Sequence, residues 1–145
     1  MKRIMAFCAA LLAAAAFTVQ AVEGQPYNEG PVSNIDYVKI KPGKFDEYMA
    51  YLAGPYRELM DAQKKAGLIT SWAIYVTNAR NPQEPDMYLV TTYPNMAAFD
   101  NLQDRSAPHI DKVFGSRKKS FEKYAARETM RDVLGSELVR ELILK

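Results

Sequence analysis

The chain has 145 residues and a formal net charge of +2, a length typical of one ordinary globular domain. Its single cysteine, Cys8, lies near the amino terminus, so internal disulfides and sites built from several thiolates are excluded by inventory. The nearly neutral charge gives little of the long-range positive field on which non-specific nucleic-acid binding depends, so we expect no nucleic-acid partner.

Residues 1–21 have the organisation of a secretory signal peptide. The basic pair Lys2–Arg3 precedes an apolar run over residues 4–17, and Val19 and Ala21 occupy the minus-three and minus-one positions of a signal-peptidase site. This run is too short to span a bilayer comfortably, which favours a cleaved leader over a stable membrane anchor. Because two basic residues and no acids leave with the leader, 17 basic and 17 acidic residues remain. We therefore expect a periplasmic or secreted mature protein.

Residues 22–32 contain two glycines and two prolines, which predicts an extended N-terminal arm. The first strand is expected over residues 33–40, where β-branched and aromatic side chains are frequent. Residues 45–66 then carry apolar side chains at three- and four-residue steps, which is typical of an amphipathic helix. Within this helix Gly54–Pro55 predicts a kink, and Gly67 is suited to a left-handed cap after its last turn.

The second half of the chain begins with two expected strands, over residues 68–77 and 87–93, joined by a proline-containing hairpin loop. Asn95 is a plausible cap for a second helix, which we expect to be interrupted at Ala107–Pro108. Further helix is expected from about residue 110 to residue 134, with a break near the glycine and serine at 115–116. A final apolar segment, residues 138–144, predicts the last strand.

This order of elements predicts an α+β fold of the ferredoxin-like type, a split βαβ sheet with helices on one face. The domain is expected to cover residues 33–145. In its first strand Asp36 and Val38 share one face, while Ile35 and Tyr37 share the other, so neither face is cleanly polar. A sheet with one face open to water should alternate more sharply, which favours a partner on the second face.

Four short motifs point to a known superfamily. Residues 38–45 run from a strand into a helix through a Pro-Gly turn, and residues 67–69 with Trp72 open the second strand. Residues 93–99 and 106–109 resemble the third strand and the second helix of that superfamily. On these motifs the chain resembles the dimeric α/β-barrel superfamily, near the group related to antibiotic-biosynthesis monooxygenases.

The resemblance covers roughly residues 34–144 and implies a homodimer, in which two sheets pair face to face into a barrel. It also implies a small organic ligand or substrate. Some superfamily members that degrade haem use a histidine on the second helix, near the place of His109, whereas Tyr93 stands where those enzymes have a tryptophan. No cofactor is evident from the residues themselves, and haem enters as an alternative through the resemblance alone.

His109 is the only histidine, so any conventional imidazole base, haem ligand or metal ligand has to be this residue. It is therefore the candidate catalytic residue, and the competing interpretation is a partly exposed histidine at a helix end. No two-histidine zinc motif is present, so no metal site is expected. The basic segment over residues 112–131 is either a solvated helix face or a contact for anionic lipid or cell-wall polymer.

Aromatic and polar side chains on the strands are candidates for a ligand pocket, because phenol donors in an apolar wall suit an aromatic ligand. A buried carboxylate must be paired or protonated, and Arg140 is a potential partner for Asp36. The ligand-binding candidates are Asn34, Asp36, Trp72, Tyr75, Tyr93 and Arg140. The competing interpretation is that Asp36 lies at a solvated edge, that Trp72 packs on the sheet, and that Tyr48 and Tyr56 belong to the helix core.

Two functions remain open. The first is an exported small-ligand-binding dimeric α/β-barrel protein that need not be a catalyst. The alternative is a cofactor-independent or haem-dependent monooxygenase-like enzyme that acts on an aromatic or other planar organic substrate. The first is favoured because the inventory of acid-base groups is small.

The leader yields a direct prediction. We expect exported protein to begin at Val22, because Val19 and Ala21 form the signal-peptidase site. N-terminal sequencing of exported material is the measurement. A mature chain that begins at Met1, or well beyond Glu29, would contradict the prediction.

Overall fold

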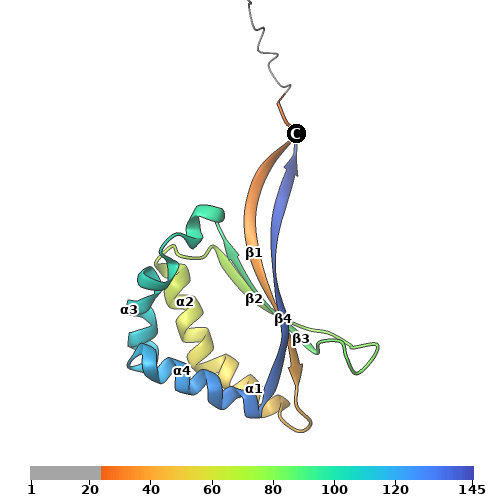
Figure 1. Ribbon diagram of the computed structural model, residues 1–145, viewed down its shortest axis with the longest axis vertical. Coiled ribbons are helices and arrows are strands. Elements are labelled where there is room, and N and C mark those ends of the chain that lie inside the picture. Colours follow the sequence, from red (N-terminus) through yellow and green to blue (C-terminus); the bar gives the residue numbers. More distant parts are fainter. Residues whose placement is uncertain (1–23) are drawn as a thin grey trace, which may run out of the picture.

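The structure is a computed structural model, and it describes residues 24–145; the expected leader lies outside the described residues. The fold is α+β, with a four-stranded antiparallel sheet covered by helices on one face (Figure 1). The sequence-based prediction of this class is confirmed. The strand order β2-β3-β1-β4 is consistent with the ferredoxin-like arrangement.

The sheet is built around its central strand β1 (Tyr27–Ile40), which pairs with β3 (Met87–Tyr93) and with β4 (Arg131–Leu144). Strand β2 (Ser71–Val76) pairs with β3 at the other edge. Strands β1 and β4 have 14 residues each and continue as a two-stranded ribbon beyond the helices (Figure 1). β4 is therefore a long edge strand.

Both long strands exceed their predicted lengths. β1 begins at Tyr27 instead of residue 33, because the arm residues before 33 pair with the end of β4. The helix predicted to continue to residue 134 is wrong, since β4 already begins at Arg131. Gly135, the residue that follows the predicted helix, instead lies opposite Tyr37 at a register shift in the β1–β4 pairing. Such a bulge accepts an extra residue and is a common place for glycine.

The first helical region contains α1 (Phe45–Tyr51), a wide helical turn η1 (Leu52–Tyr56) and α2 (Arg57–Lys65). The predicted kink is confirmed, because Gly54 leaves helical geometry with φ −99° and ψ −112°. Gly67 adopts the left-handed conformation expected of the cap, with φ 71°.

The second helical region has four segments. They are η2 (Met96–Phe99), α3 (Leu102–Phe114), α4 (Arg117–Ala126) and η3 (Arg127–Thr129). The predicted cap at Asn95 is confirmed, since its side-chain oxygen accepts a hydrogen bond from the backbone N–H of Ala98 at 3.2 Å.

The breaks in this region lie partly where the sequence indicated. The interruption expected at residues 107–108 is wrong, because α3 continues through Pro108 and the chain turns earlier, at Asn101, with φ 52°. A single proline removes one helical hydrogen bond, which the rest of α3 tolerates. The break near residue 115 is confirmed: Gly115 has φ 84°, and the Ser116 hydroxyl accepts from the backbone N–H of Lys119 at 3.1 Å.

The core lies between the sheet and the first helical region. Alternate residues of β1 and β3 face the helices, among them Val38 and Met87, and both are fully buried. Tyr48 and Leu52 pack against them from α1 and η1. No helix among residues 24–145 has both the length and the apolar character needed to cross a bilayer.

The opposite face of the sheet is not covered by any element of the described chain (Figure 1). A shallow hollow of about 220 Å³ lies on it. It is lined by Ile35, Tyr37, Tyr75, Tyr88 and Val90. Tyr37 and Tyr88 pack edge to face with ring centroids 5.4 Å apart. We call this surface the open face. Its hollow is lined by apolar and aromatic side chains, and the carboxylate of Glu137 lies beside it, where it accepts a hydrogen bond from Tyr37.

A short ion pair fastens the β2–β3 loop to β1. Asp86 accepts hydrogen bonds from Lys39 Nζ at 2.8 Å and from the backbone N–H of Ile40 at 2.9 Å. Partial burial raises the pKa of Asp86, but these two bonds and the Lys39 charge outweigh it, so the pKa lies below its ordinary value. A carboxyl group with a lowered pKa stabilises the fold at neutral pH and loses this contribution in acid.

We expect Asp86→Asn to lower the free energy of unfolding by about 1 kcal/mol at neutral pH. The difference from wild type should close as the pH falls through the lowered native pKa of Asp86, because protonated Asp86 no longer pairs with Lys39. Urea unfolding at neutral pH and below about pH 3 measures both quantities. Asp132→Asn is the matched control, since its pair with Lys41 is more exposed. A difference that does not change with pH would contradict this account.

Candidate functional site

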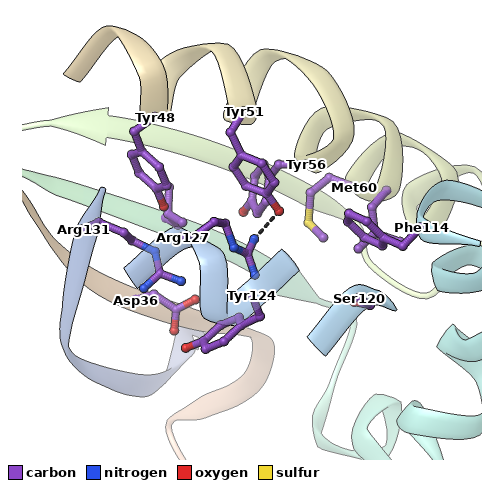
Figure 2. A pocket seen from close by; sticks show the side chains of 12 residues that line it. Asp36, Tyr48, Tyr51, Tyr56, Met60, Phe114, Ser120, Tyr124, Arg127 and Arg131 are labelled. Atoms are coloured by element: carbon purple, nitrogen blue, oxygen red, sulfur yellow. Dashed lines mark hydrogen bonds between the residues drawn. The ribbon is translucent and has the colours of Figure 1, made fainter. Parts of the chain in front are cut away.

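A pocket of about 210 Å³ lies between the sheet and the helices. Its lining comes from every layer of the fold: β1, β3 and β4 below, the first helical region on one side, and α3, α4 and η3 on the other (Figure 2). It is lined by Asp36, Tyr48, Tyr51, Tyr56, Leu59, Met60, Leu89, Phe114, Ser120, Tyr124, Arg127 and Arg131. We call it the Tyr/Arg pocket, after its four tyrosines and two arginines.

Arg127 is the polar centre of this pocket. Its Nη1 donates to the Tyr51 hydroxyl, and its guanidinium carbon lies 4.5 Å from the centroid of the Tyr51 ring and 4.8 Å from that of Tyr124 (Figure 2). Its Nε atom is buried and has no hydrogen-bond partner. Burial lowers the pKa of Arg127, and the charge of neighbouring Arg131 lowers it further.

Arg131 reaches the same pocket from the first residue of β4. It is only 5% exposed, and its guanidinium carbon lies 5.0 Å from the centroid of Tyr124 and 6.0 Å from that of Tyr48. In the described chain neither Arg127 nor Arg131 has a carboxylate within ion-pair distance. Both cations are therefore held largely by aromatic faces, a contact that offsets only part of the cost of burial.

Asp36 is the acidic residue of the lining. Its carboxylate accepts hydrogen bonds from Asn34 Nδ2 at 3.0 Å and from Ser136 Oγ at 2.6 Å. Asn34 in turn accepts from Ser136 at 3.0 Å. This network fixes the Asp36 carboxylate on the sheet floor through neighbours on β1 and β4.

Three tyrosines of the first helical region form one wall: Tyr48 is buried, and Tyr51 and Tyr56 are half-buried. Burial raises the pKa of Tyr48, Tyr51 and Tyr56, so their hydroxyls remain protonated hydrogen-bond groups at neutral pH. Tyr56 packs edge to face on Trp72, with ring centroids 5.9 Å apart. Trp72 stands behind this wall and donates from its indole nitrogen to Asp61 at 3.0 Å.

Some of the residues that the sequence suggested lie together and others do not. Asp36 lines the pocket, and Asn34 donates a hydrogen bond that orients the Asp36 carboxylate. Trp72 packs against Tyr56, which is part of the pocket wall. Tyr93 lies on the same sheet face, opposite Val32, and packs against Phe99, but it is outside the lining.

The remaining candidates are dispersed. Tyr75 lies on the open face. Arg140 does not pair with Asp36; its Nη1 lies 2.6 Å from a carboxylate oxygen of Glu29. His109 lies half-buried in α3 and does not line the Tyr/Arg pocket. The structure therefore does not gather His109 with Trp72 and Tyr75 into one site.

The sequence interpretation missed the two arginines, which it assigned to a basic solvated helix face. The sequence did contain a signal for them, because Tyr124, Arg127 and Arg131 are spaced by three and four residues. If this segment is taken as a helix, that spacing places an aromatic ring and two cations on one face. The burial of Arg131 depends on its position in β4, and the sequence-based prediction placed this residue in a helix instead.

Comparisons with protein-family models and with curated proteins give no match. Among solved structures the chain is similar to protein SO0527 from Shewanella oneidensis, with a TM-score of 0.50 and 17% sequence identity. The similarity covers 81% of this chain and 96% of that chain. At this level of identity it shows a shared α+β fold, and the site must be interpreted from the residues of this chain.

Proposed function

We propose that the mature protein is an exported small-ligand-binding protein, and that its ligand occupies the Tyr/Arg pocket. The observation that carries this proposal is a cavity of about 210 Å³ lined by Arg127 and Arg131, neither of which has a carboxylate within ion-pair distance in the described chain. The Nε of Arg127 is also buried without a hydrogen-bond partner. Buried polar groups in folded proteins are nearly always hydrogen-bonded, so an unpaired one calls for a missing partner. A dry engineered cavity of roughly 150 Å³ holds benzene, so this pocket has room for a substituted ring.

Binding is favoured over the monooxygenase-like alternative by the chemistry of the lining. The pocket offers tyrosine hydroxyls, two guanidinium groups and one carboxylate, whose Oδ1 accepts two hydrogen bonds. No lining residue is a histidine or cysteine, and His109 lies elsewhere in α3. This set is suited to recognition by donated hydrogen bonds and aromatic contact rather than to proton abstraction.

The open face supports the second part of the proposal, a ferredoxin-like homodimer in which two sheets pair as a dimeric α/β barrel. The five aromatic and aliphatic residues that line its hollow are not covered within the protomer. The neighbouring edge strand β4 exposes Val139 on the same face, beside Glu137. An isologous pairing buries the same patch on both copies, which removes this apolar surface from water.

We expect mass analysis to find a small molecule retained by the mature protein purified from its native compartment. Ser120→Phe should lower its occupancy about tenfold or more, because the added ring fills the pocket from α4. Ala125→Phe, at an exposed position of the same helix, is the control and should retain the molecule. Full occupancy in Ser120→Phe, or no retained molecule in wild type, would contradict the proposal.

We expect light scattering to show a homodimer at micromolar concentration, and Ile35→Lys to give monomers because it places a charge at the centre of the open face. Val76→Lys is the matched control. Val76 is an exposed apolar strand residue that lies on the opposite face of the sheet, with buried Met87 as its cross-strand partner. A wild type that is monomeric, or an Ile35→Lys variant that remains dimeric, argues against pairing through this face.

A further inference from the structure

The charges of the residues that line the Tyr/Arg pocket do not balance. Arg127 and Arg131 bring two guanidinium groups, which remain protonated in proteins, whereas Asp36 brings one carboxylate. Asp36 lies beyond ion-pair distance from both arginines and accepts hydrogen bonds from Asn34 and Ser136. The pocket therefore has an excess of one positive charge in a poorly solvated place, where an unbalanced charge is costly.

The geometry of Arg127 indicates which group supplies the missing negative charge. Its Nη1 is used by Tyr51, and its Nε, buried and without a partner, belongs to the side-on edge of the guanidinium. That edge presents two parallel N–H donors, which match the two oxygens of a carboxylate. Arg131 is only 5% exposed, and its guanidinium adds further N–H donors to the same pocket.

The rest of the lining gives the shape of the molecule that carries this charge. In Figure 2 the arginines and Asp36 lie toward one end of the pocket, and Met60 and Phe114 lie toward the other. Tyr51 and Tyr56 lie between the two ends, whereas Tyr48 and Tyr124 lie with the arginines. A ligand with a charged head and an apolar, ring-sized body fits this gradient, since the ring contacts aromatic walls while the head reaches the cations.

Resting on the proposed function, we infer that the Tyr/Arg pocket binds a small aromatic carboxylate, whose carboxylate is held by Arg127 and Arg131. One such monoanion neutralises the excess charge and offers acceptor oxygens to the guanidinium groups of Arg127 and Arg131. The tyrosine hydroxyls then select among rings by the polar substituents they carry.

The test compares benzoate with benzamide, which has nearly the same shape and no charge. Binding to the mature protein is followed by the fluorescence of Trp72, the one tryptophan of the chain, which contacts the pocket wall through Tyr56. We expect benzoate to bind about tenfold more tightly than benzamide or better, the difference that a charge-assisted bidentate contact supplies.

Variants locate the carboxylate. Arg127→Gln should remove the preference for benzoate, and Arg127→Lys should restore it only in part because lysine lacks the planar fork. Arg117→Gln, an exposed arginine on α4 that bonds Gln103, is the matched control and should keep the preference. Circular dichroism and light scattering confirm that each variant is folded and dimeric, and the wild-type comparison stands without any variant.

The outcomes separate the two proposals. Equal affinity for benzoate and benzamide would overturn the inference of an anionic ligand and leave the binding function intact. A preference that persists in Arg127→Gln and in Arg131→Gln would also overturn it, because the anion would then bind elsewhere. If neither probe binds and the purified protein retains no small molecule, the proposed function itself fails.

Discussion

The antiparallel pairing of β1 with β4 is the constraint on which the rest of the structure depends. This pairing extends from Tyr27 opposite Leu144 to Ile40 opposite Arg131. The two paired strands therefore set the length of the sheet. Because β1 is central, the pairing also fixes which of its side chains face the helices. Asp36 is thereby placed on the pocket floor, and Arg131 enters the fold at the strand end nearest α1.

The site is held by the junction where η3 becomes β4. The backbone N–H of Met130 donates to the carbonyl of Arg127 at 2.9 Å, and the Met130 carbonyl accepts from Lys41 at 2.9 Å. Met130 belongs to the hydrophobic core, so packing anchors the residue that separates the two pocket arginines. Arg127 therefore lies in a short helical turn and Arg131 at the start of a strand, and this preorganisation lowers the entropic cost of binding a ligand there.

Local signals predicted local features correctly, and long-range pairing decided the rest. Features that depend on a few adjacent residues were predicted correctly. They are the kink at Gly54, the cap at Asn95 and the bounds of β3. The start of β4 does not depend on adjacent residues alone: residues 131–134 resemble helix until strand β1 is available to pair with them. The same pairing buries Arg131, so the residue spacing could group the two arginines with Tyr124 but could not show that they line a pocket together with Asp36.

The walls of the Tyr/Arg pocket differ in how firmly they are built. The sheet floor and the tyrosine wall rest on buried side chains, among them Tyr48 and Leu52, whereas α4 has no buried residue. Hydrophobic burial supplies most of the free energy that fixes a helix in place, so α4 is the part of the wall that opens at the lowest cost. It contributes Ser120 and Tyr124 to the lining, and Tyr124 also covers both arginines. A ligand that bridges the arginines and this ring would therefore stabilise the least anchored helix against the most rigid part of the fold.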